Sequence, residues 1–396
     1  MSETFEVEID RVAAGGTVGR LDDGRVVFVR HALPGERVRV ALTQERSRFA
    51  RGDALDVLSA SPQRVVAPCA YAHPGGCGGC DLQHVEPAYQ LEWKAVVVKE
   101  QFQRLAHLEV DVQVQSVGAT LSSRTRLRCG VNDEGRLGLR QHGSDDIVPL
   151  AGCHVFSVRG NEAFMNDWEG AEEVEIRVMG DAAFAVVTLE DGNVVTATLD
   201  GLIDEEPQRS HVEVNGERFR ISPLSFWQSH EMAPEILSRE VLELAKVKRG
   251  GRVVDLYSGV GLFAVPLARR VGSDGRVLAI ESSPSSAADA RRNVADLSHV
   301  TIVEQRVTPR IIRDTVDHTT TVVLDPPRSG AGIAVMEALV QTRPERIVYV
   351  SCDAATLARD IRVLVDAGWN LSQLRAFDLF PMTEHVELVA ALDRPR

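Results

Sequence analysis

Two residues near the C-terminus could carry out covalent chemistry on a pyrimidine ring. Cys352 follows the apolar run at residues 347–350, and Glu387 precedes the apolar run at 388–392. A thiolate that adds to C6 of a pyrimidine turns the ring into an enolate whose C5 can attack a methyl sulfonium. A base must then remove the C5 proton before the thiolate can leave. We predict Cys352 as the nucleophile and Glu387 as the base, because Glu387 begins a strand whereas Glu384 lies in the preceding turn.

Each of these residues also has a simpler interpretation. A lone cysteine is more often a small buried hydrophobic residue, and a glutamate near a turn is usually a solvated carboxylate. Cys352, however, directly follows a predicted parallel strand, and ligands bind at the C-terminal ends of such strands. This position favours the catalytic interpretation of Cys352, which in turn favours that of Glu387.

A glycine-containing turn predicts a cofactor site in the same region. The run DLYSGVGLF begins at Asp255, includes Tyr257 and opens a helix, and its Gly259 and Gly261 allow a ligand to approach the backbone. Glu281 ends the next predicted strand, where a carboxylate can bind ribose hydroxyls. The third glycine of the dinucleotide pattern and the lysine of a phosphate loop are absent. We therefore predict S-adenosylmethionine, with Asp255 near its ammonium group.

A rigid acidic motif ends the fourth strand that the sequence predicts after residue 247. The run LDPPR places Asp325 before two prolines and Arg328 after them. Prolines restrict the backbone, so Asp325 should lie at the floor of the pocket and hold the target base or the cofactor. Methyltransferases that act on amino groups usually have an aromatic residue where Arg328 stands. The arginine therefore favours a different target atom.

Four cysteines have the pattern of a metal site. Cys69, Cys77 and Cys80 are clustered with seven and two residues between them, and Cys153 follows further on. Four thiolates fit either a [4Fe–4S] cluster or a structural zinc ion, and free thiols are the remaining alternative. Cys129 lies on an apparent strand, and we interpret it as a core residue.

These residues need elements that bring them together. From residue 247 onward, strands, glycine-rich turns and helices alternate, which predicts a doubly wound, mostly parallel, Rossmann-like α/β sheet. Strand-like runs at 110–214 predict a mostly antiparallel β domain. Between residues 5 and 59, short β-type runs alternate with glycine-containing turns. They predict a five-stranded barrel of the oligonucleotide-binding (OB) kind, with an SH3-like barrel as the alternative.

The net charge of the chain argues against binding of nucleic acid, whereas the distribution of its arginines argues for it. The net charge is −13, whereas affinity for phosphates comes mainly from Lys and Arg. Between Arg20 and Arg64, however, seven further arginines and no lysine occur, so we expect a basic, RNA-binding face on the barrel. We find no membrane-spanning run and no export leader, and expect a cytoplasmic protein. Nothing indicates an obligate protein partner, so we expect a monomer.

Over nearly its full length the chain resembles the TRAM-domain RNA uridine-5-methyltransferases. The resemblance implies a TRAM barrel at 1–60, a cysteine-ligated iron–sulfur loop at 61–84, a β-rich central domain at 85–220 and a class I methyltransferase domain at 221–396. It implies methylation of C5 of a uridine in structured RNA, with 23S ribosomal RNA favoured and the transfer RNA T-loop next. Methylation of another RNA base and an inactive RNA-binding or folding factor are the alternatives.

The resemblance rests on several motifs in combination. Residues 223–229 are similar to the family's Phe-x-Gln segment, which implies that Gln228 contacts the cofactor. Residues 255–263 are similar to the family's glycine loop, and Glu281 is similar to its ribose ligand. Residues 324–328 are similar to its Asp-Pro-Pro-Arg motif. Residues 351–352 are similar to its nucleophile motif and residues 385–387 to its base motif.

The chain departs from the family pattern at three places. Asp353 and Ala354 replace the usual Asn and Pro after the nucleophile. Residues 303–306 lack the Asp or Asn that many class I enzymes carry near adenine, and the first cysteine gap is longer than the usual five residues.

Overall fold

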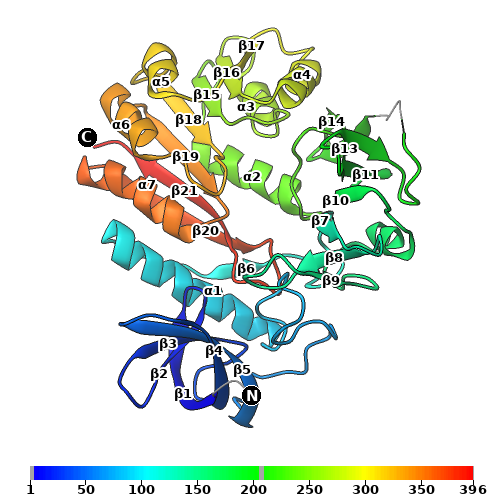
Figure 1. The fold of residues 1–396 in the computed structure, drawn as a ribbon. Helices are drawn as coiled ribbons and strands as arrows, with labels where there is room; N and C mark the ends of the chain where they lie inside the picture. The colour runs from blue at the N-terminus through cyan, green and yellow to red at the C-terminus, as the bar shows by residue number, and fades with distance from the viewer. Residues whose placement is uncertain (1–3, 205–208, 396) are drawn as a thin grey trace.

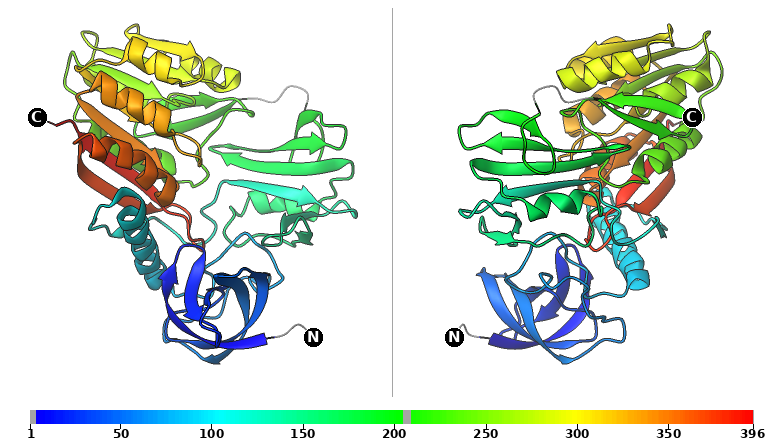
Figure 2. Two further views of the ribbon diagram at one scale, coloured as in Figure 1. Left: turned by 60° about the vertical axis from the view of Figure 1, so that its left-hand side comes forward. Right: turned by 90° about the vertical axis from the view of Figure 1, so that its right-hand side faces the viewer.

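Three bodies of secondary structure make up the chain. The computed structural model describes residues 4–204 and 209–395. Figure 1 shows a barrel near the N-terminus, a central sheet and a larger C-terminal sheet covered by helices. In Figure 2 the barrel lies below, and the other two bodies lie side by side above it. Among the described residues, no helix has both the length and the apolar character needed to cross a membrane.

Alternating burial closes the N-terminal strands into a barrel. Val27, Val29 and Val38 have no exposed area, and Gly52 approaches Val40 so closely that an added Cβ would lie 2.5 Å from its side chain. The strands pair in the order β1-β2-β3-β5-β4, and β1 and β4 complete the closure. The prediction of a five-stranded barrel is confirmed. The strands are β1 (Thr4–Ala13), β2 (Gly16–Arg20), β3 (Val26–Arg30), β4 (Arg37–Glu45) and β5 (Phe49–Ser59).

The central sheet is antiparallel throughout, as predicted. It has six strands in the order β12-β11-β10-β7-β8-β9, and a separate hairpin, β13-β14, leads into the C-terminal body. Its core is closed by a short 3-10 helix at Gly160–Met165. The strands are β7 (Arg126–Val131), β8 (Leu137–Arg140), β9 (Ile147–Pro149), β10 (Ala171–Met179), β11 (Ala182–Leu189), β12 (Val194–Ala197), β13 (Ser210–Val214) and β14 (Glu217–Ile221).

The C-terminal sheet is doubly wound, which confirms the Rossmann-like prediction. Its eight strands have the order β17-β16-β15-β18-β19-β21-β20-β6, and β21 is antiparallel to both of its neighbours. Side chains alternate across the sheet, so Val253 and Val254 enter separate buried clusters on its two faces. The strands are β15 (Arg252–Leu256), β16 (Arg276–Glu281), β17 (Val300–Glu304), β18 (Thr320–Leu324), β19 (Arg346–Ser351), β20 (Asn370–Asp378) and β21 (Glu387–Asp393). The helices are α2 (Ala233–Ala245), α3 (Ala264–Val271), α4 (Pro284–Asn293), α5 (Pro309–Thr315), α6 (Ile333–Thr342) and α7 (Ala354–Asp366).

One segment of the predicted central domain extends the C-terminal body instead. Strand β6 (Val114–Ser116) pairs with β20, and helix α1 (Pro87–Gln101), continued by a π-helical turn at Phe102–Ala106, packs against α7. Local periodicity could not reveal this, because the pairing joins segments far apart in the sequence.

The turn between β20 and β21 is held by three other parts of the chain. From α1, the fully buried Lys94 pairs with Asp378 and donates to the Phe380 carbonyl oxygen at 2.9 Å. From the cysteine loop, Leu82 N donates to the Met382 carbonyl oxygen at 3.0 Å. From the barrel, Gly15 N donates to Glu384 Oε2 at 2.8 Å. The residue that follows this turn is Glu387.

Candidate active site

One large cavity lies at the C-terminal edge of the sheet. We call it the catalytic cavity; its volume is about 670 Å³. Strands β15, β16, β18 and β19 all end at it, as expected where loops follow parallel strands. Seven of the nine predicted catalytic and cofactor residues line it: Gln228, Tyr257, Gly259, Glu281, Asp325, Cys352 and Glu387.

Cys352 and Glu387 reach the catalytic cavity from neighbouring strands. Cys352 lies between the end of β19 and the start of α7, and the buried Glu387 begins β21. The Asp353 side chain caps α7 by accepting a hydrogen bond from Thr356 N at 2.7 Å. Asp353 therefore fixes the helix start beside Cys352, although it replaces the family's asparagine. Glu384 does not line this cavity, because its side chain turns toward the barrel.

Burial favours the neutral forms of Cys352, Asp325 and Glu387 in the cavity. Burial, followed by the charge of Glu387, raises the pKa of Cys352 to about 11. Burial raises the pKa of Asp325 to about 7, against a hydrogen bond from Gln228. Burial and the charge of Asp325 raise the pKa of Glu387 well above its usual range, and Arg328 opposes this effect. Two buried carboxyls so close together retain at least one proton near neutral pH.

The glycine loop forms the other end of the cavity. Gly259 has a φ of 56°, and a Cβ added there would meet nothing within 4 Å, so the loop presents open space to a ligand. Its N–H donates to Glu281 Oε2 at 2.8 Å, and Ser283 N donates to Oε1 of the same carboxylate at 2.6 Å. Tyr257 also has a positive φ, 62°, a conformation that costs on the order of 1–3 kcal/mol and is concentrated at functional sites.

Two predicted cofactor residues lie behind the loop and not in the cavity. Asp255 has no exposed area, and neither carboxylate oxygen has a hydrogen-bond partner within the described parts of the chain. Burial, followed by the charge of Asp325, raises its pKa well above the usual range. Gly261 supports the turn, and its N–H donates to the Ser258 carbonyl oxygen at 2.9 Å. Asp255 is therefore not exposed to the cavity, whereas the open space at Gly259 leaves room for a cofactor along the loop.

The segment before α2 brings a further side chain to Asp325. Gln228 Nε2 donates to Asp325 Oδ2 at 3.4 Å. Its segment is fixed at two points: Arg177 donates to the Ser225 carbonyl oxygen at 2.8 Å, and the buried Asp289 accepts from Ser225 Oγ at 2.7 Å. Gln228 is therefore pre-positioned by the central sheet and by α4.

Two residues at the mouth of the cavity are absent from the sequence prediction. Phe226 is half exposed, and the guanidinium of Arg126 lies 4.6 Å from its ring centroid. Arg328 also lines the cavity. From the sequence it was considered only as an indication of which atom is methylated. Phe226 belongs to the Phe-x-Gln segment and could have been found there. Arg126 is one of several arginines on an ordinary β-type run and carries no such signal.

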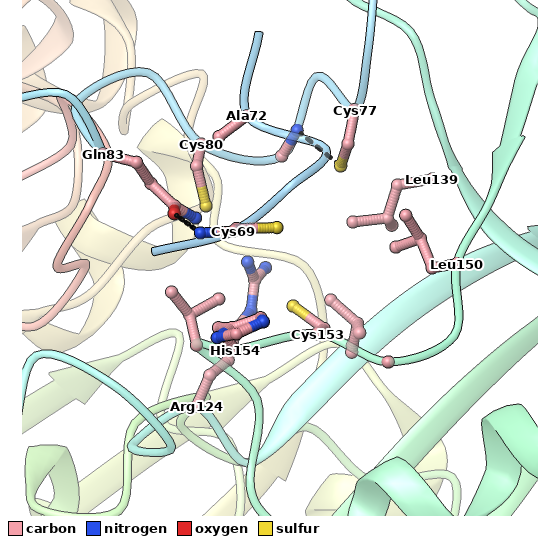
Figure 3. Close-up of a pocket in the computed structure, with 14 residues that line it drawn as sticks. Cys69, Ala72, Cys77, Cys80, Gln83, Arg124, Leu139, Leu150, Cys153 and His154 are labelled. Carbon is pink, nitrogen blue, oxygen red and sulfur yellow. Dashed lines mark hydrogen bonds between the residues drawn. The ribbon is translucent and has the colours of Figure 1, made fainter. Parts of the chain in front are cut away.

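The four predicted metal ligands line a separate, mostly apolar cavity, the cysteine cavity. Figure 3 shows the side chains of Cys69, Cys77, Cys80 and Cys153 around a common space. Burial raises the pKa of Cys77 to about 11 and of Cys80 to about 12. Across residues 4–204 and 209–395, no group of three or more His, Cys, Asp or Glu side chains is arranged as a metal site. Cys129 is fully buried in the core of the central sheet.

Family models match successive parts of the chain. The model for tRNA (uracil-5-)-methyltransferase matches residues 305–394, and that for the TRAM domain matches residues 2–55. A third model, for protein-L-isoaspartate(D-aspartate) O-methyltransferase, matches residues 210–308, which contain the glycine loop. The first two matches cover the barrel and the strands that carry Cys352 and Glu387.

Similar proteins extend over nearly the whole chain. An uncharacterized RNA methyltransferase of Streptomyces avermitilis is 39% identical over 99% of both chains. The 23S rRNA (uracil(1939)-C(5))-methyltransferase RlmD of Acinetobacter baylyi is 31% identical over 94% of this chain and 89% of its own. The crystal structure of the tRNA (uracil-54, C5)-methyltransferase of Pyrococcus abyssi, bound to S-adenosyl-L-homocysteine, superposes with a TM-score of 0.72. It has 25% identity and covers 98% of this chain and 100% of its own. The chain therefore belongs to the TRAM-domain family of S-adenosylmethionine-dependent RNA uracil-5-methyltransferases.

Proposed function

We propose that this protein methylates C5 of one specific uridine in a structured RNA, with 23S ribosomal RNA as the favoured substrate and the transfer RNA T-loop next. One observation carries the proposal. Cys352, Asp325 and Glu387 come from three separate strand ends and meet in the cavity that also holds the glycine loop. A nucleophile, a polar group for the base and a proton acceptor are thus within one cavity.

Cys352 is proposed as the nucleophile. Its sulfur forms a bond to C6 of the uracil, and its proton passes to the ionised member of the Asp325–Glu387 pair and from there to solvent, so that the pair again has one carboxylate. The C5=C6 electrons then move toward O4, and C5 takes the methyl group that S-adenosylmethionine supplies. The raised pKa of Cys352 means that the resting residue is a thiol, so a neighbouring base must activate it.

Glu387 is proposed as the base of the second half-reaction. It removes the C5 proton, the C5=C6 bond re-forms, and the thiolate of Cys352 leaves. Glu387 is buried at the start of a strand and lines the cavity, whereas the Glu384 carboxylate accepts a hydrogen bond from the barrel and does not line the cavity. Asp325, which shares its environment, is proposed to hydrogen-bond the uracil ring or the cofactor.

The cofactor is proposed to lie along the glycine loop. Gln228, Tyr257, Gly259 and Glu281 line this end of the cavity and would contact it. Both Glu281 oxygens already accept backbone hydrogen bonds, which fix the carboxylate for a ribose. Asp255 and Gly261 do not line the cavity and would support the loop from behind, so a contact between the Asp255 carboxylate and the cofactor stays a prediction.

We further propose that Cys69, Cys77, Cys80 and Cys153 hold a [4Fe–4S] cluster, with zinc as the alternative. The proposal is supported by the number and type of the donors, since four half-buried thiols from a loop and from the central domain line one cavity, although they are not arranged as a metal site in the described structure. The group would supply a covalent link between these two segments. Iron and acid-labile sulfide in anaerobically purified protein would support the cluster, whereas zinc without visible absorption would support the alternative. Cys77→Ala should lose either metal.

The reaction is tested by incubating the protein with methyl-labelled S-adenosylmethionine and unmethylated RNA. Transfer RNA and 23S ribosomal RNA are supplied separately and then digested to nucleosides. We expect label in 5-methyluridine from ribosomal RNA. Label in another nucleoside would overturn the assignment of the target atom, and RNA binding without label would indicate an inactive factor.

A further inference from the structure

The loop that carries Arg328 is fixed at a point outside the catalytic cavity. This loop connects β18 to α6. The backbone N–H groups of Ala331 and Gly332 donate to Asp360 Oδ2 at 2.7 Å and 3.1 Å. Gly330 approaches the same oxygen so closely that an added Cβ would lie 2.6 Å from it. The loop is therefore packed directly against α7, the helix that carries Asp360.

The same carboxylate also ties the loop to the strand that precedes Cys352. Tyr349 of β19 donates its hydroxyl hydrogen to Asp360 Oδ2 at 2.7 Å, and its hydroxyl oxygen accepts from Ala331 N at 3.0 Å. Tyr349 and Asp360 are both fully buried, and neither lines the catalytic cavity. Hydrogen bonds to a carboxylate are among the strong ones. Since Cys352 lies between β19 and α7, the loop is bound to both elements that hold Cys352.

Arg328 places a positive charge beside Cys352 in the catalytic cavity. Both residues line this cavity. Burial and the charges of Glu387 and Asp325 raise the pKa of Cys352, whereas the charge of Arg328 and a hydrogen bond from its side chain act in the opposite direction. A cation next to a cysteine stabilises the thiolate, which is the nucleophilic form. Two carboxyl groups therefore oppose the formation of the thiolate, and the guanidinium favours it.

We propose that Arg328 is a further catalytic residue, whose guanidinium stabilises the thiolate of Cys352, and that Asp360 and Tyr349 are the positioning residues that keep it there. This inference rests on the proposed role of Cys352 as the nucleophile. Arg328 stays protonated throughout, and the proton of the thiol still passes to the Asp325–Glu387 pair. The sulfur is negatively charged before it bonds to C6 and again when it leaves, so the guanidinium would assist both steps.

Alkylation of Cys352 by iodoacetamide tests the proposal without RNA or cofactor. The thiolate is the reacting species, so the rate at about pH 8, measured by mass spectrometry of the peptide, reports how much thiolate is present. Arg328→Met keeps the bulk and removes the charge, and its rate should fall at least about fivefold, the factor for one net hydrogen bond. Asp360→Ala should give a similar fall, and Tyr349→Phe a smaller one. Arg328→Met combined with Asp360→Ala should be no slower than Arg328→Met, because Asp360 acts through Arg328.

A purely structural role of Asp360 would give the opposite result. If Asp360→Ala only loosened the fold, Cys352 would become more accessible and react faster, and the fully buried Cys129 would react as well. Glu240→Ala is the matched control, because Glu240 is also buried on a helix and pairs with Arg375 outside the catalytic cavity. It should lower the melting temperature and leave the alkylation of Cys352 unchanged. A rate in Asp360→Ala or in Arg328→Met at or above that of the wild type would overturn the proposal.

Turnover separates this inference from the proposed function. In the labelled methylation assay, kcat/KM should fall in Arg328→Met and in Asp360→Ala, and the two factors should not multiply in the double variant. Asp360→Asn should retain most of the activity, because an amide oxygen can still accept from Ala331 N and Gly332 N. Factors that multiply would show that Asp360 acts elsewhere and would refute the proposal. If the wild type transfers no methyl group but the alkylation rates change as expected, the proposed function fails and the stabilisation of the thiolate stands.

Discussion

The barrel and the mouth of the catalytic cavity both contain arginines, but their charges are used differently. Four of the nine arginines between residues 20 and 64 form ion pairs with barrel carboxylates, and Arg51 lies over two aromatic rings. Arg126 at the cavity has no carboxylate within 4 Å among the described residues and lies over Phe226 instead. A stretch that is basic in sequence therefore has a weaker field than its arginine count suggests. The expected basic face of the barrel remains a prediction.

Cys352→Ala should have the largest effect on methyl transfer. It should leave the binding of RNA at the cavity mouth almost unchanged. Turnover should fall by on the order of 10³-fold or more, whereas RNA affinity should change little, because Arg126 and Phe226 are untouched. The measurements are label transfer and filter binding. RNA that contains 5-fluorouridine should form a covalent adduct, stable to denaturation, with the wild type only. Residual turnover near the wild-type rate would remove Cys352 from the mechanism.

Glu387→Gln should allow methyl transfer and prevent release. Without the base the C5 proton remains, so the thiolate cannot be eliminated, and methylated RNA should stay bound through denaturing electrophoresis. Glu384→Gln is the matched control, because it lies three positions away and outside the catalytic cavity. Free methylated product from Glu387→Gln would reject the assignment.

The pH dependence of kcat/KM tests the shared proton of the cavity. A base must be ionised to act, and the pKa of Asp325 is raised to about 7. Below pH 7 both carboxyls of the Asp325–Glu387 pair bind protons, so kcat/KM should fall roughly tenfold per pH unit. Melting curves at each pH control for unfolding. A flat profile between about pH 5.5 and 8.5 would contradict a carboxyl pair with raised pKa values.

Arg126→Ala should weaken RNA binding and lower its dependence on salt. An arginine that contacts phosphate contributes about one unit to the slope of log K against log salt. Arg126→Lys should retain most of that slope and lose the stacking over Phe226. Binding is measured over a range of salt concentrations with Cys352→Ala protein, so that no turnover occurs. An unchanged slope would show that Arg126 does not contact a phosphate, and the contrast between the cavity arginine and the paired barrel arginines would then fail.

Arg39→Ala in the barrel should have the smallest effect. Arg39 pairs with Asp56 at 2.8 Å and both side chains are exposed, so the pair contributes at most about 1 kcal/mol to stability. Affinity for RNA should change less than about twofold, since its charge is already compensated. A loss as large as that of Arg126→Ala would show that RNA displaces the barrel carboxylates.

The elements were predictable where the signal is local. Strand periodicity and glycine turns predicted the five-stranded barrel and the doubly wound sheet, and the run from Asp255 to Gly261 predicted its loop. Motifs at strand ends also meet in one cavity, because parallel strands place their C-terminal ends together. The positions of Cys352, Asp325 and Glu281 at this edge of the sheet could therefore be predicted from the sequence alone.

The features that were missed depend on tertiary distances. The burial of Asp255, the mutual effect of Asp325 and Glu387 on their pKa values, and the ion pairs of the barrel depend on residues whose separation in the sequence says nothing of contact.

The turn before Glu387 also sets the order in which the protein can become complete. Gly15 and Glu384 are 369 positions apart, and Lys94 in α1 contacts the same turn. Domains of a growing chain fold as units, with the N-terminal ones first. The barrel and α1 can therefore form early, but the contacts that hold the turn must wait until residues 378–384 have emerged from the ribosome. A chain that stops before β21 lacks Glu387, the proposed base, together with the strand that bears it.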